Sequence, residues 1–141
     1  MKRFYRCVCG LLAMAMLMVI PAFAAEERAS NYFWSSSVYL HKTSATTFEA
    51  WFDVDAVSKM DELGASEIKI QRSSDGVNWT TMKTYTKESY SNLICENTGS
   101  HAACVSYTGT AGYYYRAKIT LYAKKGTGSA EWYRDTSSMQ L

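Results

Sequence analysis

Residues 113–123, Tyr-Tyr-Tyr-Arg-Ala-Lys-Ile-Thr-Leu-Tyr-Ala, decide the fold class. From Tyr115 onward every second residue is apolar, and the residues between are polar, charged or aromatic: Arg116, Lys118, Thr120 and Tyr122. Successive side chains of a β-strand point to opposite faces of its sheet. The alternation therefore predicts a strand with one buried face and one solvated face.

Shorter runs of the same alternation predict further strands at 38–42, 48–55, 68–72, 79–84, 103–107 and 130–134. The sequence Ser73-Ser74-Asp75-Gly76 predicts a hairpin turn between two of them, because glycine readily adopts a positive φ. Only Ser58–Ala65, with Met60 and Leu63, is expected to form a helical turn. This pattern indicates an all-β fold, a single antiparallel β-sandwich of about seven strands.

The long strand and the following Gly126 resemble the F strand and F–G turn of fibronectin type III and related immunoglobulin-like domains. Residues 68–72, the Asp75-Gly76 turn and Trp79 are similar to the C–C′ hairpin of those domains. The resemblance implies that Trp51 or Phe52 is the large core aromatic of strand B. The whole chain also resembles a group of short secreted proteins of Gram-positive gut bacteria, which implies no particular activity.

The N-terminus has the three parts of a cleavable export signal. Basic residues come first, an apolar run from Cys7 to Ile20 follows, and small residues at Ala22 and Ala24 end it. We expect residues 1–24 to be a signal peptide, with cleavage after Ala25 as the alternative, and the protein to be secreted and extracellular. Residues 25–34 then form a short segment before a domain at 35–141. An uncleaved membrane anchor competes, but a span needs ~20 apolar residues.

Charge argues against two classes of partner. The chain has 15 Lys and Arg against 13 Asp and Glu, and the predicted leader carries Lys2, Arg3 and Arg6. Its removal leaves a net charge of −1, as 12 minus 13. Nucleic acids and anionic membranes attract proteins that have a concentrated positive face. We therefore expect no nucleic-acid partner and no membrane span after cleavage.

Cys95 and Cys104 are the two cysteines that follow the predicted leader. In an exported protein, an even pair of cysteines favours a disulfide. His101 lies between them, but two cysteines and one histidine are one ligand short of a tetrahedral zinc site. The sequence therefore predicts a Cys95–Cys104 bridge, no metal and no cofactor.

Residues for catalysis are sparse. The histidines are His41 and His101, and no serine lies in a nucleophile-elbow motif. Glu49, Asp53 and Asp55 share a strand face, and a glycosidase or a calcium site competes there with a solvated sheet face. We expect no enzymatic activity.

Aromatic residues are abundant, with 11 Tyr and 4 Trp in the chain. The alternation turns Tyr114 and Tyr122 outward, and Trp51 as well if Phe52 is inward, so the three are predicted to form one flat platform. Arg116 and Lys118 lie beside it to bond hydroxyl groups. We expect binding of a glycan or a protein surface, and cross-strand packing of the rings is the competing explanation. The alternative functions are a secreted effector, bacteriocin- or toxin-like, and a small secreted hydrolase.

Overall fold

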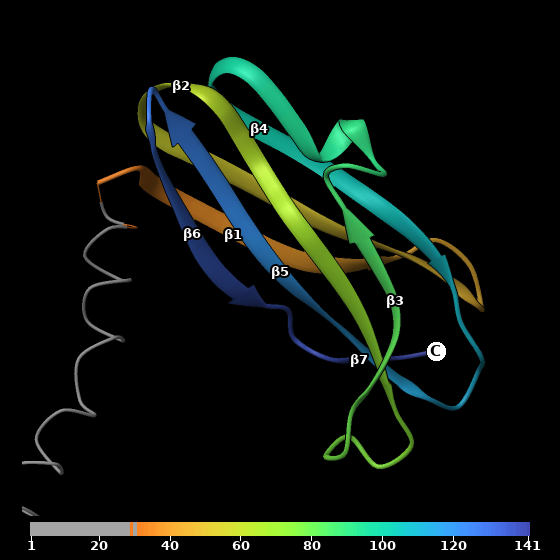
Figure 1. Cartoon of the computed structure of the whole chain (residues 1–141). Helices are drawn as coiled ribbons and strands as arrows, with labels where there is room; N and C mark the ends of the chain where they lie inside the picture. The colour runs from red at the N-terminus through yellow and green to blue at the C-terminus, as the bar shows by residue number, and fades with distance from the viewer. Residues whose placement is uncertain (1–28, 30) are drawn as a thin grey trace, which may run out of the picture.

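The structure is a computed structural model that describes residue 29 and residues 31–141 (Figure 1). Its elements are β1 (Phe33–Lys42), β2 (Thr47–Ser73), β3 (Thr80–Thr86), a 3₁₀ turn η2 (Ser91–Leu93), β4 (Ile94–Thr108), β5 (Tyr114–Lys125), β6 (Gly128–Asp135) and β7 (Met139–Gln140). The predicted leader and its cleavage site lie outside the described residues. Within the described part of the chain, no helix has the length and apolar character needed to cross a bilayer.

Strand β2 organises the fold because it pairs along both of its halves. Residues 48–56 pair with β1, residues 47–55 and 60–64 pair with β4, and residues 62–73 pair with β5 and, over 67–72, with β3. Between the halves β2 bends, since the step from Asp55 to Met60 on β2 faces only the step from Ser100 to Thr98 on β4. The seven strands therefore form one antiparallel sheet that curls into a half-barrel.

The curled sheet has two sides that face each other across the core. We call β1, residues 47–55 of β2 and residues 100–108 of β4 the β4 side. We call β3, residues 62–73 of β2, β5 and β6 the β5 side, which Figure 1 shows in front of β1. The rings of Phe48 and Tyr115, one from each side, have centroids 5.2 Å apart and are both fully buried. The Tyr85 hydroxyl also joins the sides by donating to the Ser106 carbonyl oxygen at 2.7 Å.

The predicted all-β class and antiparallel pairing are confirmed. The finer prediction of an immunoglobulin-type sandwich is not confirmed, because the two sides are continuous through β2. The predicted strands 48–55 and 68–72 are two parts of β2, and β7 was not expected from the sequence. The core aromatic is Phe52, which is fully buried, and Trp51 points outward.

The predicted helical turn at Ser58–Ala65 is wrong, since these residues continue β2. Met60 and Leu63 are three positions apart and both buried, a spacing that imitates a helix face. Strand register shifts on either side of them, at Asp55/Met60 and Ala65/Glu67, break the strict alternation. Irregularities of this kind let a strand bend and bury consecutive apolar groups.

The predicted hairpin turn at Ser73–Gly76 is confirmed, with Gly76 at φ 75°. The Asp75 carboxylate accepts hydrogen bonds from the backbone N–H groups of Asn78 and Val77, both at 2.8 Å. These bonds, with those from the Asn78 amide and the Ser73 hydroxyl, hold the pKa of Asp75 well below its ordinary value. The Ser73 hydroxyl also accepts from the Gly76 backbone N–H at 2.9 Å, so the side chains of Asp75 and Ser73 together hold the turn.

Candidate surface groove

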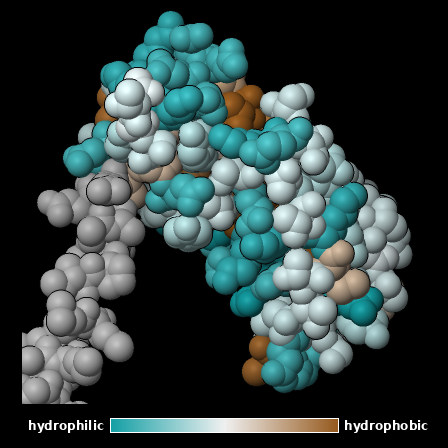
Figure 2. All heavy atoms as spheres, in the orientation of Figure 1, coloured by the Kyte–Doolittle hydropathy of each residue, from teal (hydrophilic) through white to brown (hydrophobic). Residues whose placement is uncertain are grey.

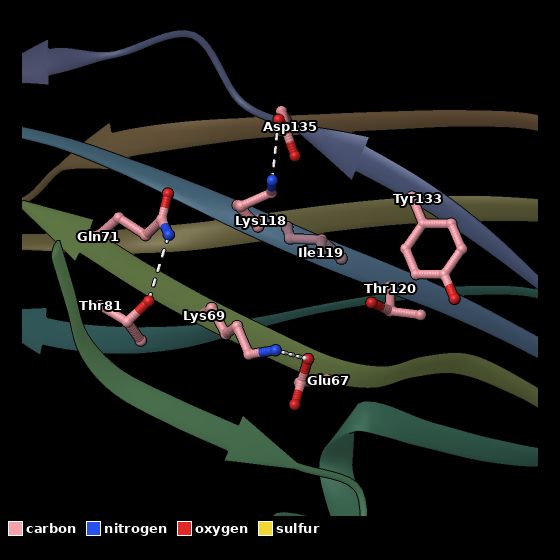
Figure 3. A pocket seen from close by; sticks show the side chains of 9 residues that line it. All are labelled: Glu67, Lys69, Gln71, Thr81, Lys118, Ile119, Thr120, Tyr133 and Asp135. Carbon is pink, nitrogen blue, oxygen red and sulfur yellow. Dashed lines mark hydrogen bonds and ion pairs between the residues drawn. The ribbon is translucent and has the colours of Figure 1, made fainter. Parts of the chain in front are cut away.

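The outer face of the β5 side carries a shallow groove that crosses four strands. Alternation on β5 creates its floor, because Ala117, Ile119 and Leu121 are buried and Lys118 and Thr120 between them point outward. Figure 2 views this face, where hydrophilic and intermediate residues cover most of the surface. The groove is lined by Glu67, Lys69, Gln71, Thr81, Lys118, Ile119, Thr120, Tyr133 and Asp135 (Figure 3).

Strand register brings the charged groups of the groove together. Lys118 of β5 lies directly opposite Lys69 of β2 and also opposite Asp135 of β6. The Lys69 ammonium lies 2.7 Å from a Glu67 carboxylate oxygen, and the Lys118 ammonium lies 3.8 Å from an Asp135 oxygen. Two like charges directly opposite each other destabilise a sheet, and the two carboxylates offset that repulsion here. The groove thus offers ammonium donors and carboxylate acceptors side by side.

Neutral polar groups extend the groove toward β3. The Gln71 side-chain amide donates to the Thr81 hydroxyl at 3.2 Å, and its oxygen accepts from Arg116 Nε at 2.8 Å. The Arg116 guanidinium also lies over the Trp79 ring, 4.4 Å from its centroid. These contacts hold Arg116 at the end of the groove, so its orientation is fixed before any ligand binds.

Tyr133 supplies an exposed aromatic ring at the opposite end. Its side chain is 69% exposed, and it lies across from Thr120 on β5. Figure 3 shows the ring face-on, at the end of the groove away from Gln71 and Thr81. The Tyr133 hydroxyl donates to a Glu131 carboxylate oxygen at 3.0 Å, and this bond raises the pKa of Tyr133. Tyr133 was not among the residues that the sequence predicted to bind.

The outward orientation predicted for four residues of β5 agrees with the burial pattern of the strand. Tyr114, Arg116, Lys118 and Tyr122 alternate with buried neighbours. Their predicted role in binding is not tested by this orientation. Tyr122 is partly covered, because the Lys87 ammonium lies 3.8 Å above its ring centroid. Lys118 is the one of the four that lines the groove.

The predicted platform of Tyr114, Tyr122 and Trp51 is wrong. Trp51 is on the outer face of the β4 side, opposite Tyr39, whereas both tyrosines are on the outer face of the β5 side. The Tyr39 and Trp51 rings are parallel within 3°, with centroids 6.2 Å apart, and Trp51 Nε1 donates to Glu49 at 2.8 Å. These rings stack on each other, which is the cross-strand packing that competed with the platform.

The predicted disulfide is absent, and both thiols are free. Asn92, not Cys95, reaches Cys104: its side-chain amide donates to the Cys104 carbonyl oxygen at 3.2 Å. Cys95 and Cys104 both lie on β4, nine positions apart along a strand that rises roughly 3.3 Å per residue, and they pair with Leu63 and Trp51 of β2 respectively. Disulfides require Cα atoms within about 7 Å of each other. Burial and the nearby Glu49 raise the pKa of the Cys104 thiol.

The other candidates for chemistry lie outside the groove. His41 Nδ1 is 3.7 Å from a Glu49 oxygen on the β4 side, and His101 Nε2 contacts the Asn92 carbonyl oxygen at 2.9 Å. Within the described residues, no three His, Cys, Asp or Glu side chains converge as a metal site would require. Comparisons with family models, curated proteins and solved structures each gave no significant match.

Proposed function

We propose that this chain is a secreted, non-catalytic protein that binds a carbohydrate in the groove of the β5 side. The observation that supports it most is the exposed Tyr133 ring at the end of a groove lined by both donors and acceptors. A sugar hydroxyl donates and accepts hydrogen bonds, and the C–H face of a sugar ring packs on an aromatic ring. Lys69 and Lys118 are the donors, and Glu67 and Asp135 the acceptors.

The balance of charge in the groove favours a neutral sugar over an ionic ligand. Each lysine has a carboxylate partner, so the four charges of the groove sum to zero. Both lysines are partly exposed, with 41% and 47% of their side chains accessible, so they can reach a ligand without leaving their partners. A neutral oligosaccharide lying along the groove would meet alternating donors and acceptors.

We also propose that the curled sheet is a variant of the immunoglobulin-like sandwich. Its two sides face each other across a single core, as the sheets of a sandwich do. The buried Tyr115 hydroxyl accepts from the Thr110 backbone N–H at 2.8 Å, five residues upstream, which resembles the tyrosine corner of such domains.

The test is binding of the purified protein to an array of defined neutral oligosaccharides, followed by titration of the best one. Tyr133→Ala removes the stacking ring and should weaken binding by about tenfold, since losses above 1 kcal/mol mark the few residues that dominate binding. Lys118→Ala should weaken binding for the separate reason that it removes a donor. Tyr39→Ala is the matched control, because Tyr39 is an exposed tyrosine on the β4 side.

Two results would contradict the proposal. One is an array without a sugar ligand, particularly if a protein ligand is captured instead. The other is a sugar that binds Tyr133→Ala and the parent equally while Tyr39→Ala loses it, which would move the site to the β4 side.

A further inference from the structure

Strand β1 has one edge without hydrogen-bonding partners among the described residues. It pairs with β2 along Phe33–Lys42, and no other described strand pairs with it. No side chain of a described residue bonds to its backbone over this range. The unpaired N–H and C=O groups of such an edge are a template for another strand.

The other long edge of the β4 side is covered. Two carbonyl groups of β4, at Ser106 and Cys104, accept hydrogen bonds from the side chains of Tyr85 and Asn92. The edge strands of the β5 side carry charged side chains, which oppose strand addition: Lys83 on β3 and Glu131, Arg134 and Asp135 on β6. Covered or charged edges are the usual protection against pairing between molecules. Among the described residues nothing covers β1, and its charged residue, Lys42, is at its end.

The sequence of β1 suits pairing with an identical strand. Residues 33–40, Phe-Trp-Ser-Ser-Ser-Val-Tyr-Leu, contain no charge and no proline. An antiparallel pair centred on Ser37 would therefore bring no like charges together between Phe33 and Leu40. Val38 and Leu40 pack on the core and remain only half-buried, so a second strand that extends the sheet would cover them.

We infer that two copies of this chain associate by antiparallel pairing of their β1 edges, which would give a symmetric dimer with one continuous sheet. A two-fold axis that passes midway between the two Ser37 residues makes the contact self-complementary, as closed dimers require. The inference does not depend on the proposed sugar site, because the groove lies on the β5 side.

Ser37→Lys tests the pairing directly. In one molecule the new ammonium lies across from Asp53, which should keep the fold intact. In the dimer it lies opposite its own copy and should weaken association by about fivefold at low salt. Sedimentation of the purified protein from micromolar to millimolar concentration measures this. Ser100→Lys, an exposed position on β4 across from Asp55, is the matched control and should dimerise like the parent.

A charge swap separates strand pairing from general effects of charge. Ser37→Lys mixed with Ser37→Glu should form a heterodimer more readily than either variant forms a homodimer, because opposite charges then face each other. A parent protein that remains monomeric at millimolar concentration overturns the inference. A dimer that ignores both variants and shows no preference in the mixture also overturns it, since its contact must then lie elsewhere.

Discussion

Gly64 lies where β2 pairs with β4 on one side and β5 on the other, opposite Ile94 and Tyr122. Its φ is 153°, and a Cβ atom added there would clash with the Leu93 carbonyl oxygen. The same Cβ would lie 3.0 Å from His101 Cδ2. Gly64→Ala therefore combines backbone strain with a clash against backbone atoms of η2.

The two costs can be estimated separately. Strain at a backbone conformation that favours glycine costs about 1–3 kcal/mol. Overpacking that forces the backbone to move costs about 1–3 kcal/mol more. Gly64→Ala should thus lower the free energy of unfolding by about 2–6 kcal/mol, a large part of the ~5–15 kcal/mol typical of a domain.

Urea unfolding followed by tryptophan fluorescence measures this loss, with the midpoint shift converted through the m-value. Gly126→Ala is the matched control, because Gly126 has φ 59° and no atom within 4 Å of an added Cβ. It should cost only the strain of a left-handed residue, about 1–2 kcal/mol. Equal losses in the two variants would refute the reasoning, since Leu93 could not then lie over Gly64.

Two further predictions concern titratable groups. Glu62 accepts hydrogen bonds from Lys124 and Lys87, and these bonds with the two positive charges lower its pKa from 4.5. The stabilisation from the Glu62 carboxylate should be complete above about pH 4.5 and should be lost as pH falls through the lower pKa of the folded state. Glu62→Gln should therefore reduce the loss of unfolding free energy at acid pH. If the variant loses as much stability at acid pH as the parent, Glu62 is not the cause. Cys95 and Cys104 should both be alkylated in the native protein without reductant. Cys104 should react more slowly, because its thiol pKa is raised and the thiolate is the reactive form. If neither thiol reacts, the two cysteines form a disulfide.

The sequence predicted correctly which residues of β5 face the core, because apolar residues occupy every second position from Tyr115 to Ala123 without interruption. It predicted the Ser73–Gly76 turn because Asp75 and Gly76 have local conformational preferences that tertiary contacts did not override. The outward position of Tyr133 could also have been predicted from the sequence. Tyr133 occupies the same alternate positions of β6 as the charged Glu131 and Asp135, whereas Ala130 and Trp132 occupy the other set. That parity was the missed signal for the exposed ring of the groove.

The bend of β2 could not be predicted from local pattern. Two apolar residues three positions apart favour a helical turn, and only the pairing of the same stretch with β4 and β5 makes it a strand. The disulfide prediction failed for a related reason. The sequence counts the residues between Cys95 and Cys104, but only the fold shows that both lie on β4, paired with Leu63 and Trp51 of β2.

The groove itself depends on register between strands that are far apart in the sequence. Lys69 and Lys118 are 49 positions apart and lie directly opposite each other on β2 and β5. Their repulsion is a cost that an uncharged pair at these positions would avoid. Glu67, two positions before Lys69, and Asp135, across from Lys118 on β6, offset that repulsion. The donors and acceptors of the groove are therefore brought together only when β2, β5 and β6 pair, which no local pattern in the sequence shows.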